Sequence, residues 1–219
     1  MDERVQRLEQ MFCEYVDLAD RIHANSANAD ECYDELRTRL SRWRLAVDNV
    51  AWLAMIDRKD IPVGFGGRTS STRQIKACLT GAKRMMDEKW LHVRTNALED
   101  IEIACNPDVT RIIWDNILDN AIKYTSESGH IWISARKVGD FTEITFRDDG
   151  RGISEANLPK VFNRYAQFEN ERQNQGLGLG LAVVKEATLA LHGEVICSSE
   201  LGKGTTIQLR LPLSKKQEE

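Results

Sequence analysis

Three short motifs in the second half of this chain constrain its fold more than any other feature. They are Asn116–Asn120, Asp148–Gly152 and Gly176–Leu181. The first offers two amide side chains, the second a carboxylate beside glycines, and the third an alternation of glycine and leucine. A metal ligand, a polar acceptor and a glycine-rich phosphate cradle can serve one ligand only if they meet. We therefore expect the fold to bring these three segments together.

The first motif lies in a helix that we expect from Asn106 to about Tyr124. Asn106 can cap the helix, and the proline that follows suits the first helical position. Asn116 and Asn120 are four residues apart and so project from one face. Their amide oxygens suit Mg²⁺ that also bridges phosphates, and Lys123 can offset phosphate charge. Taken alone, the pair is equally compatible with two asparagines edging a helix by accident.

The second motif begins with Asp148, at the end of an apolar strand. Its carboxylate can accept a hydrogen bond from an adenine amino group. Gly150 and Gly152 let the backbone pass close to a planar base. The alternative for this motif alone is a simple Asp-Gly turn.

The third motif runs into a helix expected from about Leu179 to Leu191. Free amide groups and the positive end of the helix dipole would face phosphates there. It is not a P-loop, because no Gly-Lys-Ser/Thr follows, and no dinucleotide-binding fingerprint is present. A glycine-rich hinge is the alternative.

The remaining pattern predicts an α+β architecture, with one mixed sheet and helices over one face. A helix should run from a capping box at Ser71 and Gln74 to about Glu88. Alternating segments, with Ile131, Ile133, Ile144 and Phe146 expected on inner faces, predict strands. These strands are expected at residues 91–94, 101–104, 130–137, 141–148, 194–198 and 205–211.

The first sixty residues predict an antiparallel helical hairpin, because apolar positions recur at heptad spacing on both sides of a break at residues 25–28. The two seams are Val5, Leu8, Phe12, Tyr15, Ala19 and Ile22, then Tyr33, Leu36, Leu40, Trp43, Val47, Val50 and Ala54. Two hairpins from two chains would close a four-helix bundle. Alternatively, the hairpin packs on the second domain of its own chain. The predicted domains are residues 1–60, a Pro- and Gly-containing linker at 61–71, and residues 72–219.

Composition excludes several classes of protein. A net charge of −4 over 219 residues argues against binding to nucleic acid or to a membrane surface. We see no membrane-spanning run and no signal peptide. The five cysteines are scattered without a Cys-x-x-Cys pair, which predicts free thiols in a reducing cytoplasm and neither disulfides nor a zinc site.

The stretch from about Ile101 to Pro212 resembles the ATP-binding catalytic domain of sensor histidine kinases, in the GHKL superfamily. Five motifs match in order and spacing. They are NILDNAIKYT (116–125), DDGRGI (148–153), VFNRY (161–165), GLGLGL (176–181) and GKGTT (202–206). The resemblance implies a Bergerat-type α/β sandwich after the dimerisation hairpin. The segment from 154 to 175 resembles the family's mobile ATP lid.

The resemblance also implies ATP and Mg²⁺ as cofactors, and a role for each matching residue. Asn120 would be the main Mg²⁺ ligand with Asn116 assisting, and these two act with Lys123 and Arg164 as the catalytic set. Asp148 would bind adenine. The full nucleotide-binding set is Asn116, Asn120, Lys123, Tyr124, Asp148, Gly150, Gly152, Ile153, Arg164, Gly176, Leu177, Gly178, Leu179, Gly180, Leu181 and Thr205. Arg164 would contact the γ-phosphate, and Thr205 would support the adenine pocket.

One position separates kinase from ATPase. The superfamily's ATPases carry a glutamate one turn before the metal asparagine, where it activates water. This chain has Asn116 there. A site without that base should hold ATP for transfer and resist hydrolysing it.

The acceptor histidine of the family is not evident. It usually begins an H-[ED]-x-R motif early in the first helix, and the nearest match here is Met1–Arg4, with methionine in its place. His23 ends the first predicted helix without a following acidic residue. Asp34–Thr38 mimics the motif with aspartate for histidine, in the wrong helix.

The leading hypothesis is therefore the cytoplasmic core of a two-component sensor histidine kinase, whose parent protein may be membrane-anchored. It would be a homodimer that passes a phosphoryl group through a histidine to the receiver domain of a response regulator. The alternative is a nucleotide-binding pseudokinase or fragment that signals through its dimer and partners. An ATP-hydrolysing member is a third possibility, which Asn116 disfavours.

Overall fold

The computed structural model describes residues 29–59, 68–168 and 176–213, together with Val16. The first helix of the predicted hairpin, Met1, His23 and residues 169–175 of the expected lid lie outside this range. The elements in chain order are α2 (Ala29–Arg58), β1 (Arg68–Ser70), α3 (Ser71–Glu88), β2 (His92–Leu98), β3 (Glu102–Ala104), α4 (Pro107–Tyr124), β4 (His130–Val138), β5 (Phe141–Asp148), η2 (Leu158–Lys160), α5 (Gly180–Ala190), β6 (Glu194–Glu200) and β7 (Gly204–Pro212).

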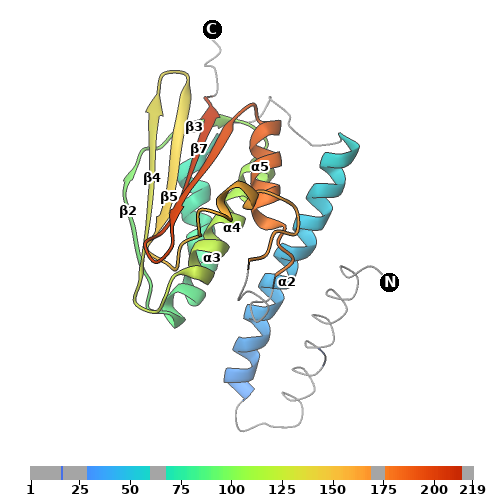
Figure 1. Cartoon of the computed structure of the whole chain (residues 1–219), viewed down its shortest axis with the longest axis vertical. Coiled ribbons are helices and arrows are strands. Elements are labelled where there is room, and N and C mark those ends of the chain that lie inside the picture. Colours follow the sequence, from blue (N-terminus) through green and yellow to red (C-terminus); the bar gives the residue numbers. More distant parts are fainter. Residues whose placement is uncertain (1–15, 17–28, 60–67, 169–175, 214–219) are drawn as a thin grey trace.

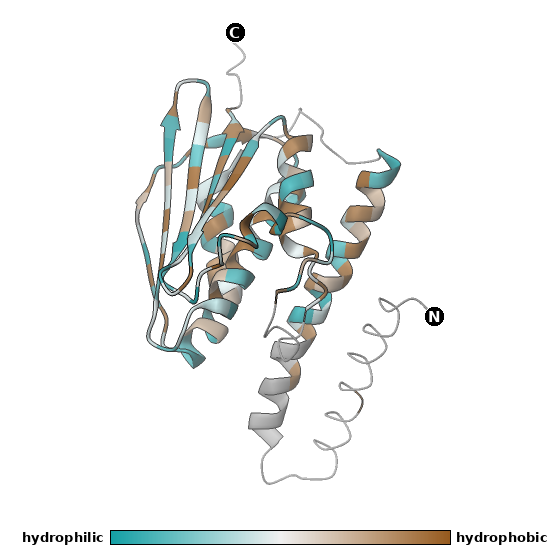
Figure 2. Ribbon diagram, in the orientation of Figure 1, coloured by the Kyte–Doolittle hydropathy of each residue, from teal (hydrophilic) through white to brown (hydrophobic). Residues whose placement is uncertain are grey.

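A five-stranded mixed sheet forms one layer, in the order β2-β4-β5-β7-β6 (Figure 1). Strands β2 and β4 are parallel, and the other neighbours are antiparallel. Residues alternate between apolar and polar along the central strands (Figure 2). Ile131, Ile133, Ile144 and Phe146 are buried, as predicted. The α+β fold class is confirmed, and the main sheet is mixed as predicted. The prediction of a single sheet was wrong, because the strand expected at 101–104 pairs with residues 68–70 in a separate two-stranded sheet.

Helices α3, α4 and α5 cover the buried face of the sheet, with α4 in contact with both of its neighbours. Helix α4 has an apolar stripe at three- and four-residue spacing, and this stripe is buried at 0–5% exposure; it consists of Val109, Ile113, Ile117 and Ala121. Trp114 is fully buried and stacks on Phe146 of β5, with ring centroids 5.8 Å apart. This packing fixes α4 against the sheet, and therefore fixes every side chain that α4 presents at its polar edge.

Side-chain caps start helices α4 and α3. The sequence predicted the cap of α4 correctly and that of α3 incorrectly. Asn106 caps α4 as expected, and its Oδ1 accepts from the amide of Asp108 at 2.9 Å. The predicted capping box at Ser71 was wrong by one residue. Ser70 is the cap and accepts from the amide of Arg73, whereas the hydroxyl of Ser71 donates to the carbonyl of Ile101.

The segment that we expected to be a linker contains structure at its end. Residues 68–70 form β1, which pairs antiparallel with β3. Strand β2 is also longer than predicted, and an irregularity between Arg94 and Ala97 divides it. The division into a hairpin, a linker and a second domain stays a prediction.

Helix α2 lies beyond α4 and α5, on the side away from the sheet (Figure 1). Its buried residues there are Ala46, Asn49, Trp52 and Leu53. The predicted seam lies elsewhere on the helix, because Leu40, Val47 and Val50 remain 39–45% exposed. Helix α2 therefore packs on the second half of its own chain through one face and leaves seam residues uncovered on another. Every helix in the described ranges is too short or too polar to span a bilayer.

The ammonium of Lys89 provides a test of how the end of α4 is held. Its Nζ donates to the carbonyls of Ile122, Lys123 and Thr125 at 2.7, 3.1 and 2.6 Å. Lys89→Met leaves these carbonyls without that donor, so we expect the free energy of unfolding to fall by about 1–3 kcal/mol in urea titrations. Lys83→Met, at an exposed position of α3, the helix that ends just before Lys89, serves as the control and should change stability by less than about 0.5 kcal/mol. Equal effects of the two substitutions would contradict this account.

Candidate active site

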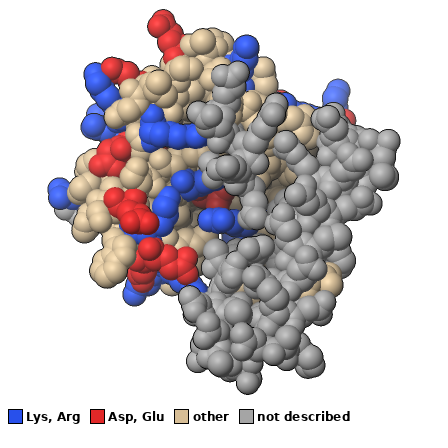
Figure 3. All heavy atoms as spheres, turned by 60° about the horizontal axis from the view of Figure 1, so that its bottom comes forward, with Lys and Arg blue, Asp and Glu red and all other residues tan. Residues whose placement is uncertain are grey.

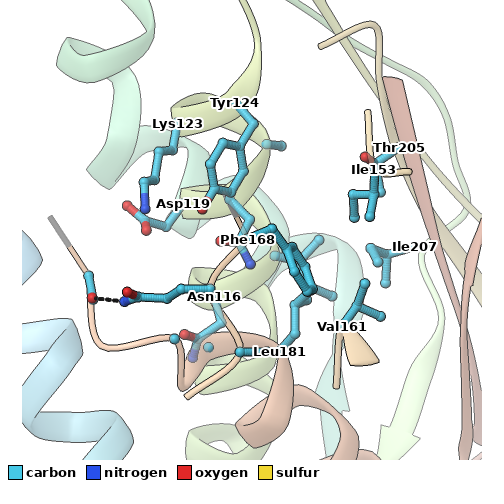
Figure 4. Close-up of a pocket in the computed structure, with 18 of the residues that line it drawn as sticks. Asn116, Asp119, Lys123, Tyr124, Ile153, Val161, Phe168, Leu181, Thr205 and Ile207 are labelled. Carbon is cyan, nitrogen blue, oxygen red and sulfur yellow. Dashed lines mark hydrogen bonds between the residues drawn. The ribbon is translucent and has the colours of Figure 1, made fainter. Parts of the chain in front are cut away.

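A cavity of about 440 Å³ opens between α4, the start of α5, the lid segment and the ends of β5 and β7. Figure 4 shows residues of α4 and residues of the strands facing each other across it. The three motifs predicted to converge do line this cavity. Its predicted lining residues are Asn116, Asn120, Lys123, Tyr124, Asp148, Gly152, Ile153, Gly176, Leu177, Gly178, Leu179, Gly180, Leu181 and Thr205. Of the predicted set, only Gly150 and Arg164 are not part of the lining.

The two asparagines of α4 differ in what surrounds them. Asn120 lines the cavity, is partly exposed, and makes no side-chain hydrogen bond with the described residues. Asn116 is 2% exposed and forms a reciprocal amide pair with Asn49 of α2, with both bonds at 2.7 Å. Its Nδ2 also donates to the carbonyl of Ile112. Of the two amides, Asn120 is the one whose oxygen is open to a ligand.

Asp148 is held by one carboxylate oxygen. Its Oδ1 accepts from the amides of Gly150 and Thr205 at 2.9 and 3.2 Å. Burial raises the pKa of Asp148, and these two hydrogen bonds oppose the rise by favouring the charged form. The second oxygen, Oδ2, has no hydrogen-bond partner among the described residues and is available to a donor in the cavity.

Ser199 of β6 anchors the loops around Asp148, and sequence reasoning missed it. Its hydroxyl donates to the carbonyl of Gly204, accepts from the amide of Ile153, and lies 3.0 Å from the hydroxyl of Thr205. No motif contains Ser199. Only the pairing of Ser199 with Thr205 across β6 and β7 brings it beside the site.

The glycines allow close approaches of backbone and side chains. Gly152 has a φ of +67°, and a Cβ there would lie 1.9 Å from the carbonyl oxygen of Glu200. A Cβ on Gly180 would lie 2.7 Å from Oδ1 of Asn116. The glycine-rich segment therefore packs directly on α4, which brings the first and third motifs into contact.

The described part of the lid segment lines the cavity at Ser154, Asn157, Val161, Ala166, Gln167 and Phe168. The side-chain amide of Gln167 donates to the carbonyl of Gly176 at 2.5 Å. Phe168 lies centrally in the cavity, between the residues of α4 and those of the strands (Figure 4).

Arg164 lies away from the position expected for it. It forms a bidentate ion pair with Asp57 of α2, at 2.7 and 2.9 Å. These hydrogen bonds lower the pKa of Asp57. The expected contact of Arg164 with a phosphate would require this ion pair to open.

Charged groups of both signs line the cavity. Arg42 and Lys123 oppose the rise that burial causes in the pKa of Asp119, and Figure 4 shows Asp119 next to Lys123. Arg151 lies over the ring of Tyr124, 4.3 Å from its centroid. Over one outer face of the molecule, acidic and basic residues are interspersed (Figure 3). Cations at the cavity suit a polyanionic ligand such as a triphosphate.

Helix α2 contributes a wall that the motifs did not predict. Arg42, Leu45, Ala46 and Asn49 line the cavity. The spacing of Ala46, Asn49 and Leu53 by three and four residues was the available signal, because it marks a second helix face with a polar residue in its centre.

The described residues hold no cluster of three or more His, Cys, Asp or Glu side chains that could bind a metal ion. The open amide oxygen of Asn120 and the oxygens of a ligand could together hold a cation here. That donor set suits Mg²⁺, which keeps several waters and commonly binds through a few protein oxygens and phosphates.

Comparison with known proteins identifies a shared domain. Residues 105–215 match the family described as histidine kinase-, DNA gyrase B-, and HSP90-like ATPase. The sensor histidine kinase WalK of Bacillus subtilis is 36% identical over 124 residues, which are 55% of this chain and 20% of WalK. The chain thus spans about a fifth of the length of that relative.

Two solved structures share the fold. The Acinetobacter baumannii histidine kinase AdeS superposes with a TM-score of 0.63 at 17% identity, over 91% of this chain and 95% of that one. Full-length ShkA, solved in complex with AMPPNP, gives a TM-score of 0.66 at 17% identity, over 94% of this chain and 46% of that one.

Two glycines with similar backbones but different surroundings test the close approach at the site. Gly139→Ala places a Cβ in open space at φ +59°, so we expect a loss of about 1 kcal/mol of stability. Gly152→Ala adds the overlap with the carbonyl of Glu200, so we expect a loss of at least about 3 kcal/mol in the same urea titrations. Similar losses for both variants would show that the close approach is not required.

Proposed function

Because the chain belongs to the family of histidine kinase-, DNA gyrase B- and HSP90-like ATPases, we propose that it is the catalytic core of a two-component sensor histidine kinase. It binds Mg²⁺–ATP and transfers the γ-phosphoryl group to a histidine, for relay to an aspartate of a response regulator. One observation carries the proposal. The cavity brings together the carboxylate of Asp148, which backbone amides hold, the open amide of Asn120 and the glycine-rich start of α5. At the position where an ATPase needs a carboxylate, the cavity has the amide of Asn116.

Adenine binding falls to Asp148. The backbone amides of Gly150 and Thr205 occupy Oδ1, so Oδ2 accepts the hydrogen bond from the exocyclic amino group of adenine. Thr205 and Ile153 line the same end of the cavity (Figure 4). The triphosphate then extends toward the start of α5, where unpaired backbone amides and the helix dipole favour negative charge.

Magnesium would be held by Asn120, with phosphate oxygens and water completing its coordination. The open amide of Asn120 fits this role, and Lys123 lies on the next turn of the same helix. When bound, magnesium would supply positive charge to offset the negative charge that develops on the phosphates during transfer. Asn116 assists only when its amide is not paired with Asn49.

Transfer is favoured over hydrolysis by the residue at position 116. An asparagine cannot act as a general base toward water. In the transfer, the bond from the γ-phosphorus to the bridging oxygen of ADP breaks while a nitrogen of the acceptor imidazole bonds to phosphorus. The protein contributes mainly positioning and charge stabilisation, which is the usual share of a protein in phosphoryl transfer.

The exposed face of α2 is the basis for the partners that we propose. The exposed seam residues Leu40, Val47 and Val50 support a homodimer through a four-helix bundle, which would also dock the receiver domain of a response regulator. We propose a cytoplasmic location for this core, within a parent protein anchored elsewhere.

A second candidate function is a nucleotide-binding pseudokinase that signals through its dimer. The sequence favours it at one point, since none of the four histidines in these 219 residues begins the H-[ED]-x-R motif of the family. This candidate keeps the nucleotide site and lacks the transfer.

A phosphoryl-transfer assay with γ-labelled ATP and the full chain separates these functions. If the chain is a kinase, we expect acid-labile label on the wild type. If position 1 is the missing acceptor site, we expect the label only on a Met1→His variant that carries an N-terminal tag. Asn120→Ala in either background should abolish the label and Mg²⁺-dependent nucleotide binding, because it removes the open metal ligand. Asn163→Ala, at an exposed position outside the cavity lining, should keep both.

The other outcomes identify the alternatives. Nucleotide binding without label or hydrolysis, in both backgrounds, supports the pseudokinase. Steady release of phosphate supports an ATPase and contradicts the role given to Asn116. Unchanged Mg²⁺–nucleotide binding by Asn120→Ala contradicts the metal assignment.

Adenine recognition is tested by Asp148→Asn. The backbone donors should hold the amide oxygen of the new side chain, which turns its NH₂ group toward the adenine amino group. We expect ATP affinity to fall about 10- to 100-fold in calorimetry, the value of a hydrogen bond to a charged acceptor.

The same assignment predicts a pH dependence. The ionised form of Asp148 is the acceptor and burial raises its pKa, so wild-type affinity should fall as pH drops, and should do so at a higher pH than for an ordinary aspartate. The comparison is made with Asp148→Asn under identical buffers, which removes the titration of ATP itself. Equal pH profiles for the two proteins would contradict the assignment.

A further inference from the structure

Helix α2 binds two groups for which the family resemblance implies roles at the Mg²⁺ ion and at the γ-phosphate. The amide of Asn116 forms its reciprocal pair with Asn49. The guanidinium of Arg164 forms its bidentate pair with Asp57. The two contacts have different chemistry and come from different parts of the site, yet the same helix makes both. The position of α2 therefore affects the metal end and the phosphate end of the site together.

The amide of Asn116 is held in place by α2 and by its own helix while α2 is docked. Both hydrogens of Nδ2 are used, one toward Asn49 and one toward the carbonyl of Ile112 at 2.8 Å. The oxygen accepts from Asn49, and it also lies so close to Gly180 that a Cβ there would be only 2.7 Å away. Only 2% of the residue is exposed, so Asn49 and Gly180 restrict the approach of a hydrated ion to this oxygen.

The geometry of α2 makes the two contacts part of one docking surface. Leu53 lies four residues from both Asn49 and Asp57, so one side of the helix carries all three. Leu53, Trp52 and Ala46 are buried in the core cluster that includes α4 and α5. Because a helix moves as a rigid element, withdrawal of this side would open the amide pair and the ion pair in one step.

We propose that docked α2 competes with Mg²⁺–nucleotide for the site, with Asn49 as the residue that withholds Asn116 from the metal. Helix α2 thus serves as an autoinhibitory element whose release frees Asn116 and Arg164 together. The inference rests on the proposed function, since it names the regulation of the same site. By linkage, whatever weakens docking of α2 must tighten binding of Mg²⁺–nucleotide, and bound Mg²⁺–nucleotide must weaken docking.

A purely structural role for Asn49 predicts that its removal does not tighten the binding of Mg²⁺–nucleotide. If Asn49 only braces Asn116 in the geometry that metal binding needs, removing it would loosen the ligand and weaken Mg²⁺–nucleotide binding. If the pair merely stabilises the packing of α2, nucleotide affinity would not change. The direction of the change in affinity therefore separates the three possibilities.

The first experiment titrates a non-hydrolysable ATP analogue into the full chain, with and without Mg²⁺. We expect Asn49→Ala to tighten binding about tenfold with Mg²⁺, the size of effect expected from removing one buried hydrogen-bonded pair, and much less without it. Asp48→Ala is the matched control, because Asp48 is the exposed neighbour on the same helix. Its affinity should equal that of the wild type.

A second variant guards against misfolding of Asn49→Ala. Asp57 is exposed, so Asp57→Asn should fold normally while it weakens the ion pair with Arg164. We expect a tightening of about two- to threefold with Mg²⁺, because exposed ion pairs contribute little. The tightening should shrink as salt rises, since salt screens that pair in the wild type.

A third measurement follows the helix itself. Hydrogen exchange of the amides in residues 46–57 should accelerate when the Mg²⁺–analogue complex is added to the wild type. In Asn120→Ala, which should not bind that complex, exchange should stay unchanged.

The outcomes separate this inference from the function on which it rests. Weaker or equal Mg²⁺–nucleotide binding by folded Asn49→Ala, or slower exchange in residues 46–57 on binding, would overturn the competition while leaving the kinase proposal intact. A wild type that binds no nucleotide would instead overturn the proposed function. Tightening by Asn49→Ala together with faster exchange supports the competition.

Discussion

Burial of α4 on three sides is the constraint on which the site depends. Its apolar stripe packs on the sheet, Trp114 stacks on Phe146, and Gly180 lets the start of α5 approach Asn116 closely. Because interiors are close-packed, a helix fixed this firmly has little freedom to rotate or slide. The polar edge that carries Asn116, Asn120 and Lys123 is therefore set by apolar contacts on the other faces of the same helix.

The polar side chains of the site differ in how many of their hydrogen-bonding atoms already have a partner. Asp148 satisfies one oxygen with backbone donors and keeps the other open, which offsets part of the cost of burying a carboxylate. Asn120 keeps its amide open, whereas Asn116 is fully engaged with Asn49 and Ile112. In this arrangement the second oxygen of Asp148 and the amide of Asn120 are open to a ligand, whereas the Asn116–Asn49 pair opens only if α2 moves.

Much of this arrangement was predictable because it depends on local patterns. The cap at Asn106, the stripe of α4 and the alternation of β4 and β5 all follow from short-range periodicity. Nearly all of the residues predicted for the site do line the cavity, although the wall that α2 contributes was not predicted. Errors arose where two equivalent local choices competed, as with Ser70 and Ser71, or where a short strand needed a distant partner, as with β1 and β3. Ser199 and Asn49 could not be assigned to the site, because only long-range packing brings them there.

The sequence by itself determined the kind of chemistry that this chain can support. Residue types at fixed spacing decide which groups can ligate a cation, accept from a base or approach a phosphate, and Asn116 decides that no carboxylate stands at the position of the water-activating base. Only the tertiary structure decided which of those groups are engaged. In the sequence, nothing distinguishes Asn116 and Arg164 from the other predicted site residues. In the structure, both are bound by α2. The reason is physical: spacing along a chain fixes what a side chain can do, whereas its partners depend on segments that approach it from far away in the sequence.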